Sequence, residues 1–226
     1  MTKKNIMAIM MIVLTILSNS TYLNIVTAEE YKDIDTLKVE AVQKFSDIKA
    51  DSWFLKNVAV LIGKKIVNGY DDGTFKPGEQ VTKAQFIKMV VTSLGNIDLM
   101  PAEDYWARTY IQKAQDLELL NKTDEKTREN YESLMSREDM AVIISKVIVN
   151  EGFDENLEKS YASDIKDYES MDSDHKGYVL KAYSKGIITG YEDGEFKPKN
   201  GLTRAEAATV IVRMLDQDAR AVILKK

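Results

Sequence analysis

The chain has 226 residues, of which 44% are hydrophobic, so it can bury a core in one domain or two small ones. A formal net charge of −5 without a basic face excludes a dedicated nucleic-acid-binding protein, and we expect no nucleic-acid partner. Because cysteine is absent and His175 is the one histidine, the composition excludes thiol nucleophiles, disulfides and cysteine-ligated zinc. We therefore expect neither a metal site nor a cofactor.

The N-terminal residues have the pattern of a secretory signal peptide. Lys3 and Lys4 precede an apolar stretch at residues 6–17, and residues 26–28 place small side chains where a signal peptidase cleaves. We therefore predict that residues 1–28 are removed on export and that the mature protein has no membrane contact. An uncleaved membrane anchor is the alternative, although the apolar stretch is shorter than the roughly 20 residues that span a bilayer.

Two segments of the chain repeat each other. Residues 66–86 and 187–207 align without a gap, and about half of the aligned positions are identical. A third, degraded copy lies between them, with Trp106 opposite Trp53. Its loop has lost the glycine pattern and carries a polar run at residues 121–132 instead.

Each copy has the pattern of a helix, a loop and a second helix. In the first copy Trp53, Val58, Leu61 and Ile62 form an apolar stripe at helical spacing. Each second helix begins at a capping box, or a close approximation to one, in which side chains satisfy free N–H groups of the first turn. The caps are Thr82 with Gln85, Ser136 with Asp139, and Thr203 with Glu206. We predict that all three second helices bury an apolar face.

One pair of helices of this size cannot close a core alone, so the copies are expected to pack together. We predict an all-α, mainly helical fold in which three helix-loop-helix repeats form a pseudo-threefold bundle. After the signal peptide, the predicted divisions are a charged lead-in (29–44), a first repeat (45–98), a second, degenerate repeat (99–150), and a third repeat with a polar connector and short tail (151–226).

A cation follows each of the three caps, at the first position of the predicted helix. Lys83, Arg137 and Arg204 lie there at the positive end of the helix dipole, which costs about 0.3–1 kcal/mol each. The recurrence of an unfavourable charge indicates an anionic ligand, which would also receive the unpaired N–H groups of the helix start. Internal ion pairs with acids such as Asp47 or Asp164 are the alternative.

Glycine and tryptophan residues are further candidates. Four glycines either supply turns with positive φ or let a sugar approach the backbone of a groove, namely Gly69, Gly73, Gly190 and Gly194. Trp53 and Trp106 either offer a flat apolar face to a sugar ring or pack in the core.

The sequence gives little support for calcium binding or catalysis. Residues 172–177 begin like an EF-hand loop, but Lys176 and Tyr183 stand where oxygen ligands are needed. No nucleophile with an adjacent base and no phosphate-binding glycine loop is apparent, so we expect no enzymatic activity.

Four motifs open or punctuate the copies: Phe45-Ser46-Asp47-Ile48 followed by Trp53, GYDDGTFKP (69–77), GYEDGEFKP (190–198) and TRAE (203–206). Together they resemble the S-layer homology domain, over about residues 45–216. The resemblance implies a pseudo-trimer of three repeats with a central helical core. It also implies grooves between neighbouring repeats that bind secondary cell-wall polysaccharide, often carrying pyruvate ketals.

This resemblance predicts a secreted, non-enzymatic protein of the bacterial cell wall or surface layer. It would be anchored noncovalently by anionic polysaccharide bound in inter-repeat grooves, and the groove that uses Arg204 looks least altered. The candidate binding residues are Arg204, Arg137, Lys83, Trp53, Trp106, Asp47, Asp164, Gly69 and Gly190. The alternative is a protein-interaction module of the envelope that uses the same grooves, with an S-layer or other envelope protein as partner.

Overall fold

The computed structural model describes residues 33–121, 127–152, 154, 156 and 159–223. Within these ranges the chain is helical, with isolated β-bridges and no strand. The α-helices are α2 (Ile34–Lys44), α3 (Leu55–Gly63), α4 (Lys83–Ser93), α5 (Arg108–Asp116), α6 (Arg128–Glu132), α7 (Arg137–Val147), α9 (Lys176–Ser184) and α10 (Arg204–Leu215). The 3-10 helices are η1 (Ala162–Asp164), η2 (Tyr168–Ser170) and η3 (Gln217–Ala219). The predicted all-α fold is confirmed.

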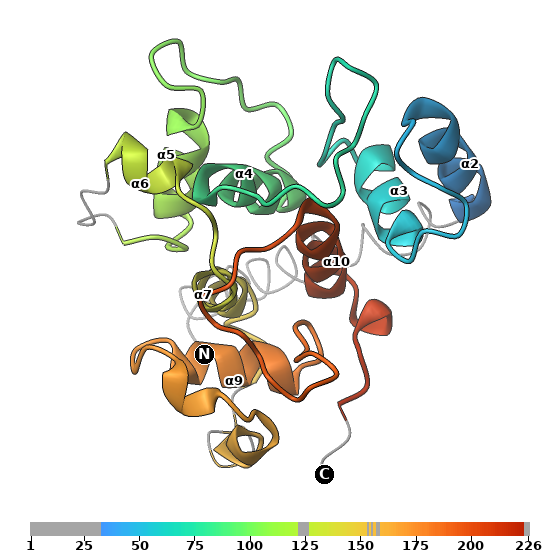
Figure 1. Cartoon of the computed structure of the whole chain (residues 1–226). Coiled ribbons are helices and arrows are strands. Elements are labelled where there is room, and N and C mark those ends of the chain that lie inside the picture. Colours follow the sequence, from blue (N-terminus) through green and yellow to red (C-terminus); the bar gives the residue numbers. More distant parts are fainter. Residues whose placement is uncertain (1–32, 122–126, 153, 155, 157–158, 224–226) are drawn as a thin grey trace, which may run out of the picture.

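Helices α4, α7 and α10 meet at the centre of the molecule, and the other helices surround them (Figure 1). Helix α4 packs against α5, α7 against α9, and α10 against both α3 and α4. Each central helix buries an apolar face, represented by Phe86 and Val90 on α4, Ile144 on α7 and Ile211 on α10. The three second helices therefore form the core, as their apolar stripes predict.

Each central helix begins directly after its predicted cap. The threonine caps of α4 and α10 form complete capping boxes with Gln85 and Glu206. Ser136, the cap of α7, accepts a hydrogen bond from the Asp139 amide at 3.1 Å, but the Asp139 carboxylate does not accept a return bond from the Ser136 amide. The aspartate side chain is one methylene shorter than glutamate or glutamine, so it does not reach back to the cap.

The segments before the three central helices are tied together in a ring. Isolated antiparallel bridges pair Gln80 with Thr203, Thr82 with Leu134, and Ser136 with Gly201. Each segment thus contacts both of the others, which gives the bundle its pseudo-threefold arrangement. The ring holds each helix start against the loop of a neighbouring copy.

The glycines of the two intact loops have different roles. Gly73 and Gly194 have φ of 75° and 83°, which confirms the predicted turns. Gly69 and Gly190 do not have positive φ, so the turn prediction is wrong for them. They are glycine because the chain is crowded there: a Cβ on Gly69 would collide with the Phe45 ring, and one on Gly190 would lie 3.0 Å from a backbone carbonyl oxygen.

Two features differ from the sequence expectations. The charged lead-in contains α2, which packs against α3. Trp53 precedes α3 and is 66% exposed, so its assignment to the buried helical stripe is wrong.

The predicted signal peptide lies outside the described residues, and among the described helices none is long and apolar enough to cross a membrane.

Candidate functional site

Three surface grooves open beside the starts of the central helices, and we name each after its cation. The Arg204 groove has a volume of about 360 Å³ and is lined by Lys65, Ile66, Val67, Asn68, Gly69, Tyr70, Gln85, Lys88, Met89, Thr92, Ile97, Trp106, Tyr110 and Arg204. The Arg137 groove, of about 180 Å³, is lined by Trp53, Arg137, Ile188, Thr189, Gly190, Tyr191, Glu206, Thr209, Val210 and Arg213. The Lys83 groove, of about 160 Å³, is lined by Lys83, Ile87, Leu119, Leu120, Asn121, Tyr131, Met135, Asp139, Val142, Ile143, Lys146 and His175.

Every groove takes residues from all three copies. In the Arg204 groove the cation comes from the third copy, the loop and α4 from the first, and Trp106 from the second. The Arg137 groove repeats this arrangement one step around the ring, with Trp53 from the first copy. The Lys83 groove completes the cycle, with His175 from the third copy. The pseudo-threefold packing therefore creates three related grooves.

Arg204 is held by the loop of the first copy. Its Nε donates to the carbonyl oxygen of Phe75 at 2.8 Å, and its Nη2 donates to that of Asn68 at 3.1 Å. The guanidinium carbon lies 4.8 Å from the ring centroid of Tyr70 and 4.7 Å from that of Phe75. Burial lowers the pKa of Arg204, but a guanidinium stays protonated in proteins. Within the described part of the chain Nη1 makes no hydrogen bond, so this nitrogen is left for a ligand.

Arg137 is held in the same way by the loop of the third copy. Its Nε and Nη2 donate to the carbonyl oxygens of Phe196 and Thr189, each at 2.7 Å. Its guanidinium carbon lies 4.7 Å from the ring centroid of Tyr191. Arg137 is only 6% exposed. Among the described residues neither arginine has a carboxylate within ion-pair distance, so both connect neighbouring copies through backbone carbonyls instead of the acids considered as partners.

The N–H groups at the helix starts are already used. In α10 the amide of Arg204 donates to the carbonyl oxygen of Glu79 at 2.8 Å, and that of Ala205 donates to Pro77 at 3.1 Å. In α7 the amide of Arg137 donates to the carbonyl oxygen of Asn200 at 3.0 Å. The expectation that an anionic ligand receives these N–H groups is therefore wrong, because the ring of neighbouring copies satisfies them.

Lys83 differs from the two arginines because it has an internal acid partner. Its Nζ lies 3.0 Å from Oδ2 of Asp139. Gln85 and Glu206, at the corresponding helix positions, fold back onto their caps, which Asp139 is too short to do. Burial acts to raise the pKa of Asp139, but the hydrogen bond and charge of Lys83 prevail and lower it. The internal pairing considered for all three cations is thus found at Lys83.

The three grooves differ in charge. The Arg204 groove has three cations, Arg204, Lys65 and Lys88, and no carboxylate among its lining residues. The Arg137 groove has two arginines and one glutamate. The Lys83 groove has two lysines, one aspartate and one histidine. The Arg204 groove is therefore both the largest and the most basic of the three.

Sequence reasoning missed Lys65 and Lys88. Lys88 is half-buried, and its Nζ lies 5.9 Å from the ring centroid of Trp106 and 5.3 Å from that of Tyr110. Burial lowers the pKa of Lys88. In the third copy the corresponding residue is Thr209. An alignment of the two intact copies therefore shows that this lysine occurs in the first copy and is absent from the third.

The tryptophans lie at two different grooves. Trp106 is half-buried in the wall of the Arg204 groove, where its ring lies 6.4 Å from that of Tyr110. Trp53 is largely exposed beside the Arg137 groove and contacts Phe54 edge-on. Neither tryptophan is fully buried, so both rings remain accessible to a sugar.

The two candidate acids do not line the grooves. The Asp47 carboxylate accepts hydrogen bonds from the amides of Phe75 and Lys76, at 2.8 and 2.7 Å, and so fixes the loop that holds Arg204. In the third copy Asp167 makes the matching bonds. Asp164, which shares a Ser-Asp-Ile motif with Asp47, lies instead in η1, where its Oδ2 is buried and finds no hydrogen-bond partner in the described part of the chain. The motif occurs in both copies but at shifted positions, which is why sequence comparison chose the wrong counterpart.

Comparison with known proteins agrees with these repeats. Residues 44–87 and 164–208 match the S-layer homology domain. The chain is 27% identical over 212 residues to an amylopullulanase of Thermoanaerobacterium thermosulfurigenes, covering 90% of this chain and 10% of that protein. It is 30% identical to an endoglucanase of Bacillus sp. (strain KSM-635), and the match covers 76% of this chain and 18% of that protein. It is 25% identical to an S-layer protein of Bacillus thuringiensis subsp. finitimus, and the match covers 76% of this chain and 21% of that protein. The chain thus spans about a fifth or less of the length of these relatives.

Proposed function

Because this chain is a member of the S-layer homology domain family, we propose that it binds the bacterial cell wall noncovalently through an anionic polysaccharide held in the Arg204 groove. The observation that carries the proposal is the gathering of three cations without a carboxylate, beside the half-buried ring of Trp106. The proposal includes export to the cell surface and a binding role without catalysis.

The groove suits a sugar that carries a carboxylate. Nη1 of Arg204 and Nζ of Lys88 are the available donors, and each charge-assisted hydrogen bond contributes about 1.5–3 kcal/mol. Two backbone carbonyls and two rings fix the guanidinium before the ligand arrives, which reduces the entropy lost on binding. The half-buried ring of Trp106 supplies an apolar face on which a sugar ring can stack. A pyruvate ketal, which places a carboxylate directly on a sugar ring, is our preferred substituent.

A second, weaker contact would come from the Arg137 groove. Its volume is half that of the Arg204 groove, and Glu206 offsets one of its two arginines. A repetitive polymer that engages both grooves raises the local concentration at the second and slows release. The Lys83 groove would contribute little, because Asp139 already neutralises its cation.

Co-sedimentation of the protein with purified wall sacculi tests the proposal. We choose Lys88→Gln because Lys88 makes no hydrogen bond that holds the loop, and Lys56→Gln as the matched control because it removes the same charge from an exposed site on α3. Lys88→Gln is expected to weaken binding by about tenfold, and Lys56→Gln to leave it nearly unchanged. Chemical removal of the anionic substituents should abolish the difference between the two variants.

Unchanged binding after removal of the anionic substituents would contradict the proposal. Binding only to sacculi that retain protein, and not to protein-free polysaccharide, would instead favour the envelope protein-interaction module.

A further inference from the structure

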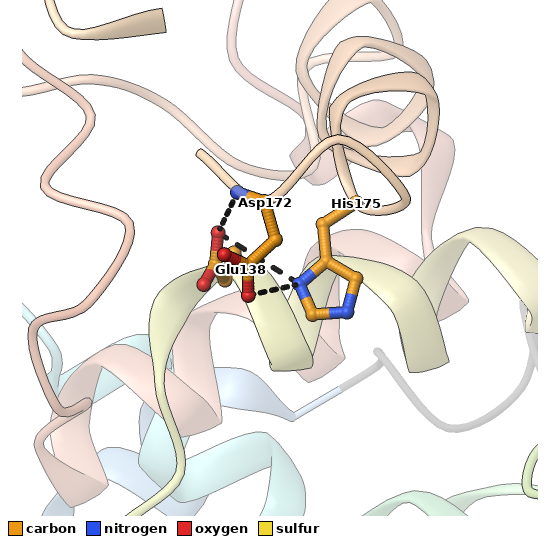
Figure 2. A group of neighbouring side chains, drawn as sticks. All are labelled: Glu138, Asp172 and His175. Carbon is orange, nitrogen blue, oxygen red and sulfur yellow. Dashed lines mark hydrogen bonds and ion pairs between the residues drawn. The ribbon is translucent and has the colours of Figure 1, made fainter. Parts of the chain in front are cut away.

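A cluster of metal-ligating side chains lies apart from the Arg204 groove, between the second and third copies. Glu138 comes from the first turn of α7, whereas Asp172 and His175 come from the segment that leads into α9 (Figure 2). One donor atom from each residue lies within 4.8 Å of the other two. The cluster therefore combines two carboxylates and an imidazole from different parts of the chain.

The imidazole nitrogen that faces the cluster has no hydrogen-bond partner among the described residues. Nδ1 of His175 lies 3.7 Å from Oε2 of Glu138 and 3.9 Å from Oδ2 of Asp172, which is too long for hydrogen bonds. This nitrogen is buried and unsatisfied, although the ring points it toward both carboxylates (Figure 2). Buried polar atoms without a partner are uncommon, and a bound ion is one of the partners that can satisfy them.

Lys199 engages the opposite oxygens of the two carboxylates. Its Nζ contacts Oε1 of Glu138 and lies 2.7 Å from Oδ1 of Asp172. The Glu138 side chain is only 3% exposed, whereas that of Lys199 is 56% exposed. One lysine cannot neutralise two carboxylates, so the cluster keeps a net negative charge on the side that faces His175.

We propose that Glu138, Asp172 and His175 bind a divalent transition-metal ion of the Zn²⁺ class. The ligand atoms would be Oε2, Oδ2 and Nδ1. Tetrahedral zinc with bonds of about 2.0–2.2 Å separates its ligands by about 3.4 Å, so the two distances from Nδ1 to the carboxylates, 3.7 and 3.9 Å, need a contraction of a few tenths of an ångström. The nitrogen ligand favours this class over Ca²⁺ and Mg²⁺, which prefer oxygen.

This site departs from the sequence expectation of no metal. His175 has no second histidine to complete a histidine-based site, and residues 172–183 by themselves lack the oxygen ligands of an EF-hand loop. Glu138 is 34 residues away from Asp172 and enters only through packing of the second copy on the third. A bound ion would join these two copies at the edge of the Lys83 groove, which His175 also lines. The inference does not depend on the proposed glycan.

Calorimetric titration of the protein with ZnCl₂ at pH 7.5 tests the site, together with thermal unfolding. We expect one equivalent of Zn²⁺ to bind. At a hundredfold excess over the dissociation constant, the unfolding midpoint should rise by about 5–10 °C. His175→Ala and Asp172→Asn are each expected to weaken binding by about tenfold or more, while Asp174→Asn, the matched control on an exposed neighbour, should not. Lys199→Gln should tighten binding, since its ammonium competes for both carboxylates.

Absence of Zn²⁺ binding by the unaltered protein would overturn the proposal. Binding that survives in both His175→Ala and Asp172→Asn would overturn it as well, because the ion would then lie elsewhere.

Discussion

The Arg204 groove and the Lys83 groove occupy equivalent places in the bundle but differ in charge, because only the Lys83 groove contains a carboxylate. Both set the first residue of a central helix against the loop region of the next copy. In the former, backbone carbonyls and aromatic rings hold the guanidinium, and two lysines add to its charge. In the latter, Asp139 neutralises the cation. Equivalent folds therefore do not give equivalent sites, because the corresponding helix position is Gln85 in the Arg204 groove and Asp139 in the Lys83 groove, and only the latter supplies a carboxylate.

The largest expected contrast is in stability. Arg204→Met removes two hydrogen bonds to loop carbonyls and leaves both carbonyl oxygens without the arginine as donor. We therefore expect a loss of about 2–4 kcal/mol in the free energy of unfolding. Lys83→Met breaks one partly exposed ion pair and is expected to cost about 1 kcal/mol or less. Urea unfolding of both variants measures the difference. Equal losses would show that the arginine does not hold the loop.

Removing the carboxylate from the Lys83 groove is expected to have an intermediate effect, on affinity for the wall. Asp139→Gln introduces the residue found at the corresponding position of α4, where it folds back onto its cap. This change frees Lys83 for a ligand, and we expect affinity for wall sacculi to rise by about threefold or more. Asp51→Asn, which removes one exposed negative charge elsewhere, controls for the change in net charge. An equal rise in both variants would attribute the gain to net charge alone.

The smallest expected effect is a pH dependence of the Lys83–Asp139 pair. The folded-state pKa of Asp139 is lowered from its ordinary value of 3.8, so the pair stabilises the fold above about pH 4. This stabilisation is lost as the pH falls below 3.8 and through the lowered folded-state pKa. Asp139→Asn should therefore cost about 1 kcal/mol or less at pH 7 and nothing below the folded-state pKa. Unfolding midpoints of both proteins between pH 2 and pH 7 provide the measurement, and a constant difference across that range would contradict the assignment.

Much of the helical framework was predictable because its signals are local. The cap residues and the apolar spacing that follows them identify the starts of α4, α7 and α10. The cations were located because each directly follows a cap, and the two intact loops because their sequences repeat. The role of Asp167 was not predictable from its motif, because it depends on contact with the Phe196 and Lys197 amides, which lie 29 and 30 residues further along the chain.

The sequence by itself determined the repeats, the three central helices and the cation that opens each one, because caps and periodicity act within a few residues. Only the tertiary structure decided that Lys65 and Lys88 join Arg204, that Asp139 pairs with Lys83, and that neighbouring copies use the helix-start N–H groups. These contacts join residues of different copies. Their geometry depends on how the three copies close into a ring, which no single segment specifies.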